Sequence, residues 1–270
     1  MLGGITDMQS LADLRNSCRG AVFIVASGPS AKEFPLQRYA SYPMMAMNGS
    51  ICRFVEMDLA PYFYLCVDSS FVRNRLPLLL QATQLAQHMA LSTRAIAAVP
   101  ENEAGALQRA GVYQFDRVNR PLNGRKAMSY RQFAWAARKD PDLECGFSLF
   151  RQTPNRIGFS RNLDKGYFSA RTIPYVAVQM AYHLGFNQVF LVGMDLDSSK
   201  GRFYEQGSAA VPSRLDGDYD DCILPCFEFM TKRVVNPDFR VYNLSMGSRL
   251  PDSVVPKLSL DQLDALLASA

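Results

Sequence analysis

The chain has 270 residues, of which 48% are hydrophobic and 20% charged, and its net charge is +4. This composition excludes a disordered chain, and so small a net charge gives no reason to expect a nucleic-acid partner. No cationic segment followed by an apolar run opens the sequence, and apolar stretches such as residues 21–26 are far too short to span a bilayer. We therefore expect a cytoplasmic globular protein.

The first half of the chain has the pattern of alternating strands and helices. A capping box at Thr6 and Gln9 predicts a helix to about residue 16. Short apolar runs that end in Gly, Asn, Asp or Ser are typical of strands buried in a parallel sheet. They predict strands over residues 21–26, 44–47, 62–67 and 93–99, a helical stretch from the third strand to about residue 88, and a helix over 101–110.

The second half begins with a segment that is harder to assign. Residues 111–165 combine turn signals with basic and aromatic side chains, which predicts a less regular helical insertion. Apolar residues at helical spacing then predict a helix over 172–184 that stops at Gly185, and a strand over 188–192. The remaining elements are a helix over about 222–235, a strand over 240–243 and a last helix capped by Ser259 and Gln262.

This alternation predicts an α/β fold with a Rossmann-like, doubly wound and mostly parallel sheet. We expect one domain over residues 1–270, with the insertion at 111–165 and a lid loop at 197–221. Ligands of such sheets bind outside the carboxyl ends of the strands. Small or polar residues follow four predicted strands, at 27–30, 48–50, 68–70 and 193–195. Turns favour the same residue types, but four such ends together predict a polar rim for a nucleotide.

Two common nucleotide motifs are missing from this rim. The dinucleotide fingerprint needs three glycines and an acid after the second strand, whereas this chain has only Gly28 and the neutral Asn48. The Walker A motif is absent as well, which argues against a P-loop NTPase. We also expect no Asp-x-Asp pair after a strand, the pair that grips a metal-bound diphosphate, and therefore a nucleotide that binds without an obligatory metal or another cofactor.

Segments along most of the chain match one family. They are residues 21–30, 47–50 and 64–68 and, more densely after residue 158, 166–172, 193–196, 201–205, 224–230 and 241–245. In these segments the chain resembles the WaaZ-type lipopolysaccharide core Kdo transferases. More distantly it is similar to bacterial sialyltransferases that modify lipooligosaccharide.

The resemblance implies a glycosyltransferase that moves Kdo from CMP-Kdo to a lipopolysaccharide core acceptor. It implies a donor site for CMP at the strand ends, with candidate contacts at Ser27, Gly28, Ser30, Asn48, Ser169, Thr172, Asp195 and Tyr204. Arg171 and Arg202 are candidates for neutralising a phosphate or carboxylate. Helix capping, loop packing and surface exposure are the plainer interpretations of the same residues.

The general base is where the chain departs from the sialyltransferases. Those enzymes use a lid histidine, whereas this chain contains only His88 and His183, and His183 falls inside an apolar helix. We therefore expect a carboxylate to remove the acceptor proton. Glu205 is the first candidate, and its competitors are Asp68 and the cluster Asp218, Asp220 and Asp221.

Seven basic residues and no acid lie between Arg117 and Lys139. They predict either one solvated helix face or a surface for lipid A, a phosphorylated core acceptor or the inner membrane, to which the enzyme would be peripheral. Arg125, Lys126 and Arg131 are the expected contacts. The interleaved aromatic residues suit a membrane interface and core packing equally.

Two other functions remain open. The first is a sialyl or other nonulosonate transferase that uses a different CMP-sugar, and the missing lid histidine counts against sialic acid. The second is a non-catalytic nucleotide-binding protein, which would bind CMP without releasing it from a sugar donor. The crowded polar rim argues against this second function, because a scaffold needs no such set.

Overall fold

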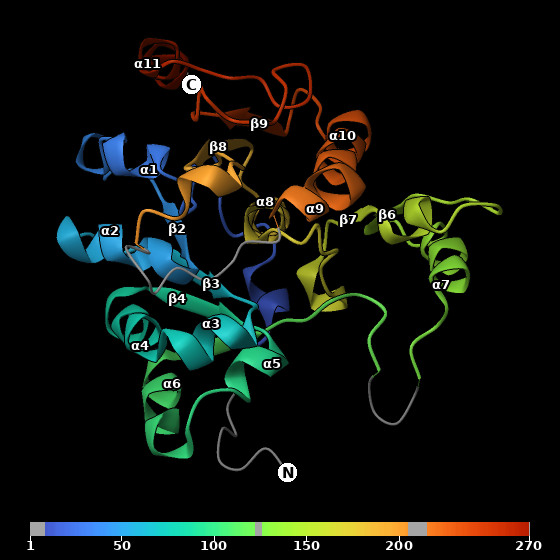
Figure 1. The fold of residues 1–270 in the computed structure, drawn as a ribbon, viewed down its shortest axis with the longest axis horizontal. Helices are drawn as coiled ribbons and strands as arrows, with labels where there is room; N and C mark the ends of the chain where they lie inside the picture. The colour runs from blue at the N-terminus through green and yellow to red at the C-terminus, as the bar shows by residue number, and fades with distance from the viewer. Residues whose placement is uncertain (1–8, 122–125, 205–214, 270) are drawn as a thin grey trace.

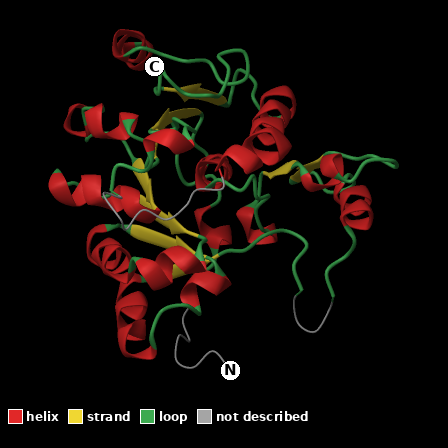
Figure 2. Ribbon diagram, in the orientation of Figure 1, coloured by secondary structure: helices red, strands yellow, loops and turns green. Residues whose placement is uncertain are grey.

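The computed structural model describes residues 9–121, 126–204 and 215–269. Seven parallel strands form the main sheet in the order β5-β4-β3-β2-β1-β8-β9 (Figures 1 and 2). Their bounds are β1 Ala21–Val25, β2 Met44–Met47, β3 Phe63–Cys66, β4 His88–Leu91, β5 Val112–Gln114, β8 Gln188–Val192 and β9 Arg240–Asn243. A separate antiparallel pair consists of β6 (Leu143–Cys145) and β7 (Gly158–Ser160).

Helices cover both faces of the sheet. They are α1 Ser30–Glu33, α2 Ile51–Glu56, α3 Ser69–Asn74, α4 Leu76–Leu85, α5 Thr93–Ile96, α6 Ala104–Ala110, α7 Tyr130–Ala137, α8 Ile173–Leu184, α9 Leu215–Asp218, α10 Leu224–Arg233 and α11 Leu260–Ala268. Val22 and Ile24 of β1 pack into the core that holds α8 and α10, while Phe23 and Val25 pack into the core that holds α2, α4 and α11. The predicted doubly wound α/β fold is therefore confirmed.

The direction of winding reverses between β1 and β8. From β1 the chain adds β2, β3, β4 and β5 on one side, and it then returns to place β8 and β9 on the other. The register pairs Ala21 with Gln188 and Val25 with Val192, so both strands end at the same level. Because the connections leave in opposite directions, a crevice opens at the carboxyl ends of these two strands.

The predicted strand over 93–99 is wrong. The fourth strand is instead β4, which begins at His88, and the preceding helix ends at Leu85 rather than near residue 88. The Ser92 side chain accepts a hydrogen bond from the Ala95 amide and starts α5. Residues 95–98 include three alanines, which favour helix over strand. The alanine-rich run after β4 is thus helical although it is apolar.

Several other predicted boundaries can be compared with the structure. The helix over 172–184 and its stop at Gly185 are confirmed, as is the capping box of Ser259 and Gln262. The helix expected from residue 222 begins at Leu224 after a π-helical turn over Tyr219–Ile223. Thr6 lies outside the described residues, and Ser10 caps a helical turn over Leu11–Leu14.

The insertion at 111–165 divides into two parts. Its first residues form β5, the edge strand of the main sheet, and only the later part, with α7 and β6, extends away from the sheet (Figure 1). The lid loop expected at 197–221 includes residues 205–214, which lie outside the described residues. No helix in the described ranges has the length and apolar character needed to cross a bilayer.

Buried polar side chains of α8 attach this helix to its surroundings. The Gln179 amide oxygen accepts hydrogen bonds from the Ser160 and Phe168 amides, and its nitrogen donates to the Phe168 carbonyl, all at 2.9–3.0 Å. His183 receives the Leu163 amide at Nδ1 and contacts the Leu11 carbonyl through Nε2. Burial lowers the pKa of His183, so its ring is neutral and structural, in agreement with its place in an apolar helix.

Replacing Gln179 by Leu should lower the free energy of unfolding by at least about 3 kcal/mol, because three buried backbone groups lose their partner at about 1–3 kcal/mol each. Urea unfolding of the purified variant measures this change. Gln81→Leu on the exposed side of α4 is the matched control and should change stability little. Equal stability of Gln179→Leu and wild type would contradict the assigned role.

Candidate functional site

A cavity of about 780 Å³ opens at the carboxyl ends of β1, β2, β3 and β8. Its wall includes Ser27 and Gly28 after β1, Asn48 after β2, and residues 67–69 after β3. Residues 193–198 after β8 and the first turn of α8 close the opposite side. The cavity therefore occupies the crevice that the reversal of winding creates, and its volume is within the usual range for small-molecule sites.

The loops after β1 and β8 are tied to each other. The Gly28 amide donates to the Gly193 carbonyl at 2.9 Å, and a Cβ at residue 28 would collide with the Asp195 carboxylate. Asp195 is buried and accepts hydrogen bonds from the amide and hydroxyl of Ser30. The Ser245 hydroxyl joins this network through Ser30. Gly28 is therefore needed for the close approach of two loops, whatever ligand the cavity takes.

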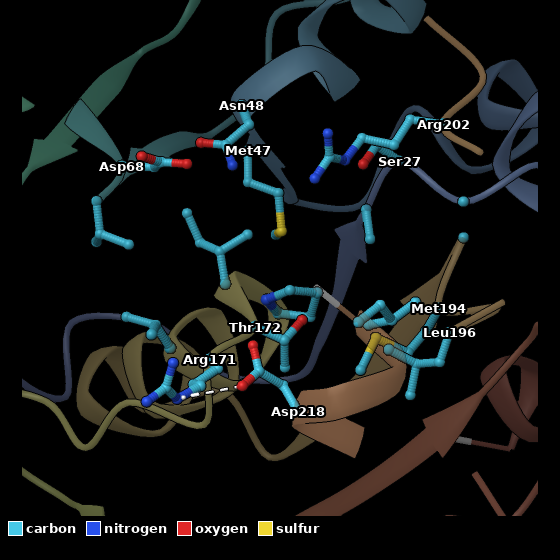
Figure 3. A pocket seen from close by; sticks show the side chains of 18 of the residues that line it. Ser27, Met47, Asn48, Asp68, Arg171, Thr172, Met194, Leu196, Arg202 and Asp218 are labelled. Carbon is cyan, nitrogen blue, oxygen red and sulfur yellow. Dashed lines mark ion pairs between the residues drawn. The ribbon is translucent and has the colours of Figure 1, made fainter. Parts of the chain in front are cut away.

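Asn48 has an unusual conformation and an unused buried oxygen. Its φ of 46° lies in the left-handed region, and its carbonyl accepts a hydrogen bond from the Tyr64 hydroxyl. Its side-chain Oδ1 is buried but has no hydrogen-bond partner among the described residues. Asn48 and Asp68 lie on one side of the cavity, facing Arg171, Thr172 and Asp218 (Figure 3). Since an unpaired buried polar atom is costly, Asn48 Oδ1 is a candidate contact for a ligand.

The opposite wall is the amino-terminal turn of α8. Thr172 is the N-cap residue, but its side chain makes no capping hydrogen bond. Arg171 precedes it with a φ of 55°, and the Arg171 amide donates to the Ser169 hydroxyl. Uncapped amides and the helix dipole together favour an anion at this end of a twelve-residue helix.

Asp68 is the carboxylate on the Asn48 side of the cavity. It caps α3, and one of its oxygens, Oδ1, accepts hydrogen bonds from the Ser70 amide and hydroxyl at 2.8 and 2.7 Å. Its other oxygen has no partner among the described residues. The carboxylate is thus held in a fixed orientation with one oxygen available for a ligand.

Arginines supply the positive charge around the cavity. Arg171 forms an ion pair with Asp218 at 3.4 Å, and Arg202 also lines the wall. Arg94 and Arg117 line it too, although the sequence pattern places neither of them in this site. Both lie close to the buried Tyr167, whose pKa is raised by burial and lowered by the neighbouring Arg117 guanidinium.

The strand-end rule could have identified Arg94, because this residue follows β4 almost directly. The rule fails here because the predicted fourth strand lies five residues too far along the chain. Arg117 stands in the sequence only as part of the basic segment. It reaches the cavity because residues 116–118 pair with Tyr167, and that pairing joins positions about 50 apart in sequence.

Most of the predicted site residues come together. Those that line the cavity are Ser27, Gly28, Asn48, Asp68, Ser169, Arg171, Thr172, Asp195 and Arg202. Ser30 and Tyr204 are not part of its wall. The Ser30 hydroxyl is engaged by Asp195 and Ser245, and the Tyr204 ring packs over Gly49 and against Phe71.

Four predicted residues lie elsewhere or outside the described ranges. Lys126 and Arg131 are exposed, away from the cavity wall, while Arg125 and Glu205 fall outside the described residues.

The expected absence of an Asp-x-Asp pair after a strand is wrong, because Asp195 and Asp197 follow β8 with this spacing. Asp195 is engaged by Ser30, and the Asp197 side chain accepts hydrogen bonds from the amide and hydroxyl of Ser199. The described residues contain no group of three or more His, Cys, Asp or Glu side chains placed to hold a metal ion. Independence from metal stays a prediction.

A parallel sheet whose strand ends and helix terminus enclose one polar cavity defines an α/β protein with a site suited to an anionic small molecule. The chain belongs to the family described as 3-deoxy-D-manno-octulosonic acid transferase WaaZ, whose model matches residues 5–261. The protein is thus a glycosyltransferase. It is 26% identical over 261 residues to a probable 3-deoxy-manno-octulosonic acid transferase of Escherichia coli (strain K12), covering 96% of this chain and 89% of that protein.

A second relative and two solved structures complete the comparison. The probable 3-deoxy-manno-octulosonic acid transferase of Salmonella typhimurium (strain LT2) is 25% identical, covering 89% of this chain and 87% of that protein. The MAf glycosyltransferase from Magnetospirillum magneticum AMB-1 has a TM-score of 0.48 at 14% identity, covering 99% of this chain and 42% of that one, so this chain spans less than half its length. The sialyltransferase CstII from Campylobacter jejuni, in complex with CMP-3FNeuAc, has a TM-score of 0.42 at 15% identity, covering 87% and 84%. Similarity at this level is not informative about the activity of this chain.

Proposed function

We propose that this protein transfers Kdo from CMP-Kdo to an acceptor sugar of the lipopolysaccharide core. Membership of the WaaZ family supports the donor sugar and the acceptor class. One observation carries the proposal. Asn48, whose Oδ1 has no hydrogen-bond partner among the described residues, and the uncapped amino terminus of α8 lie on opposite walls of the same cavity. A nucleotide sugar with an acidic group needs both a hydrogen-bond partner and an anion site.

The residues divide the chemistry between them. The first turn of α8 and Arg171 stabilise negative charge, which lies on the phosphate of the departing CMP and on the Kdo carboxylate. Asn48 holds a polar group of the donor. As CMP leaves, the sugar becomes oxocarbenium-like, and the acceptor hydroxyl attacks its anomeric carbon. Asp68 accepts the hydroxyl proton through its available oxygen, whereas Glu205, the other candidate base, lies outside the described residues.

We place the enzyme at the cytoplasmic face of the inner membrane, where a lipid-linked acceptor is presented. Only the exposed part of the basic segment supports this location. Arg117 lines the cavity and Arg120 forms an ion pair with Asp116, so these two do not belong to an outer stripe. Lys126 and Arg131 remain exposed on the outside of the insertion.

The purified protein should release CMP from CMP-Kdo and add Kdo to isolated core acceptor in the presence of a chelator, because arginines and a helix terminus replace a metal. Mass spectrometry of the acceptor detects the product. CMP-Neu5Ac should give no product. Transfer of sialic acid instead, or activity that returns only with magnesium, would overturn the donor or the metal independence, respectively. Binding of CMP without any turnover would favour a non-catalytic protein.

Asn48→Ala should weaken CMP or CMP-sugar binding by about 1–3 kcal/mol, the usual cost of deleting one partner of a buried polar contact. Calorimetry with CMP measures the loss of affinity. Asn74→Ala, an exposed asparagine at the end of α3, serves as control. Unchanged affinity in a folded Asn48 variant would remove this residue from the site.

Asp68→Asn should lower kcat by about 10²–10⁴-fold, the usual contribution of a general base, while CMP affinity stays close to wild type. The asparagine keeps the shape and the hydrogen bond to the Ser70 amide but cannot accept the acceptor proton. Single-turnover assays with CMP-Kdo separate the chemical step from binding. If this variant keeps full kcat, the base is another carboxylate, and Glu205→Gln is then the variant to measure.

A further inference from the structure

Several large apolar side chains of the insertion are exposed. Seven such side chains are strongly exposed among the described residues, and five of them lie between residues 128 and 150. Their exposed fractions are 94% for Phe150, 59% for Leu149, 55% for Trp135, 54% for Met128 and 50% for Tyr130. We call these five residues the apolar tip. In Figure 1 the insertion, with α7 and β6, stands away from the main sheet.

The side chains of the apolar tip are exposed although the interior of the insertion is packed. The inner side of α7 is already packed, since Ala134 and Ala137 are buried and Phe133 contacts Phe168. Tyr130 and Trp135 of the same helix are each at least half exposed. A packed inner side and exposed aromatic rings on one short helix indicate a surface that meets something else.

Cations accompany the aromatic rings of this surface. Arg156 lies over the Tyr130 ring, with its guanidinium carbon 4.5 Å from the ring centroid. The Lys139 ammonium lies 4.6 Å from the Trp135 centroid. Because Arg156 belongs to the connection between β6 and β7, its contact also joins that connection to α7. Trp and Tyr rings are enriched at membrane–water interfaces, and cation–π contacts place positive charge beside both rings here.

The charge of residues 126–161 is one-sided at their surface. The three acids between residues 126 and 161 are all engaged, Asp140 by Lys165, Asp142 by Arg15 and Lys165, and Glu144 by Arg161. Six cations have no ion pair among the described residues, namely Lys126, Arg131, Arg138, Lys139, Arg151 and Arg156. The surface therefore presents positive charge next to exposed apolar side chains.

We propose that the apolar tip inserts into the headgroup region of an anionic lipid bilayer, with the six cations contacting the lipid headgroups. Each cation near such a surface adds attraction, and the aromatic and aliphatic side chains add burial that salt does not screen. Aromatic side chains, Met and Arg also suit a protein interface, but the six cations, which lack an ion pair in the described part of the chain, favour an anionic lipid surface. This proposal deepens the membrane location proposed above, and it does not depend on which sugar the cavity takes.

The single tryptophan of the chain, Trp135, reports on the contact directly. Vesicles of phosphatidylcholine and phosphatidylglycerol should shift its emission to shorter wavelength and co-sediment with the protein, whereas pure phosphatidylcholine vesicles should bind it more weakly. Lipids brominated near the headgroup should quench the emission. These measurements require no sugar donor, so they test membrane contact independently of the proposed transferase activity.

The double variant Leu149→Ser/Phe150→Ser should bind anionic vesicles at least about tenfold more weakly, because burial of one such side chain is worth more than a factor of ten. Its folding and its CMP affinity should be unchanged, since both residues are exposed and neither belongs to the cavity wall. Val55→Ser, at an exposed apolar residue of α2 outside the insertion, is the matched control and should bind vesicles as wild type does.

Three results would overturn the proposal. The first is equal vesicle binding by wild type and the double variant, and the second is a Trp135 emission that anionic vesicles leave unchanged. The third is a wild-type protein that sediments as a dimer while the double variant is a monomer, which would assign the apolar tip to a second copy of this chain.

Discussion

The reversal of winding between β1 and β8 creates the space in which every other feature of the site is arranged. Parallel strands need crossover connections, and here those connections leave in opposite directions from two adjacent strands. The loops at their carboxyl ends therefore separate, and the space between them cannot be filled by either neighbouring helix. Residues after four strands and the first turn of α8 line that space. A site is thus a consequence of the topology, and the side chains decide what it binds.

The cavity wall is held in a conformation that its residues would not adopt alone. Asn48, Arg171 and Leu196 all line the cavity with φ angles near 50°, in the left-handed region that non-glycine residues rarely occupy. Such strain costs of order 1–3 kcal/mol at each residue and persists only where the surroundings enforce it. The network of Ser30, Asp195 and Ser245 provides part of that support, so these polar residues contribute to the site by fixing its backbone.

The fold gives two different surroundings to the basic residues of the insertion, which form one run in the sequence. Its basic residues are contiguous along the chain, but the fold distributes them to two places. Arg117 lines the cavity, where positive charge faces a ligand, while Lys126 and Arg131 are exposed outside it. A ligand-binding wall and an outer cationic surface can therefore lie a dozen residues apart in sequence without sharing a function.

Local sequence patterns were enough to specify the fold class and the four strand-end loops that line the cavity. Buried apolar runs followed by small polar residues specify parallel strands and their loops, and this is why Gly28, Asn48, Asp68 and Asp195 could be grouped from the sequence. The shift of the fourth strand shows the limit of such patterns. An apolar run rich in alanine satisfies both strand and helix patterns, and only the pairing of β4 with β3 selected His88–Leu91.

The roles of individual side chains came from contacts between distant segments. The resemblance makes Ser30 a candidate contact for CMP, yet Asp195, 165 positions away, engages its hydroxyl. Tyr204 packs against Gly49 and Phe71, and Arg94 and Arg117 join the wall through β4 and the pairing with Tyr167. A strand end depends on neighbours in sequence, so a local pattern fixes it. Which hydroxyl or guanidinium remains available for a ligand depends on partners that only folding brings together, and no local pattern specifies them.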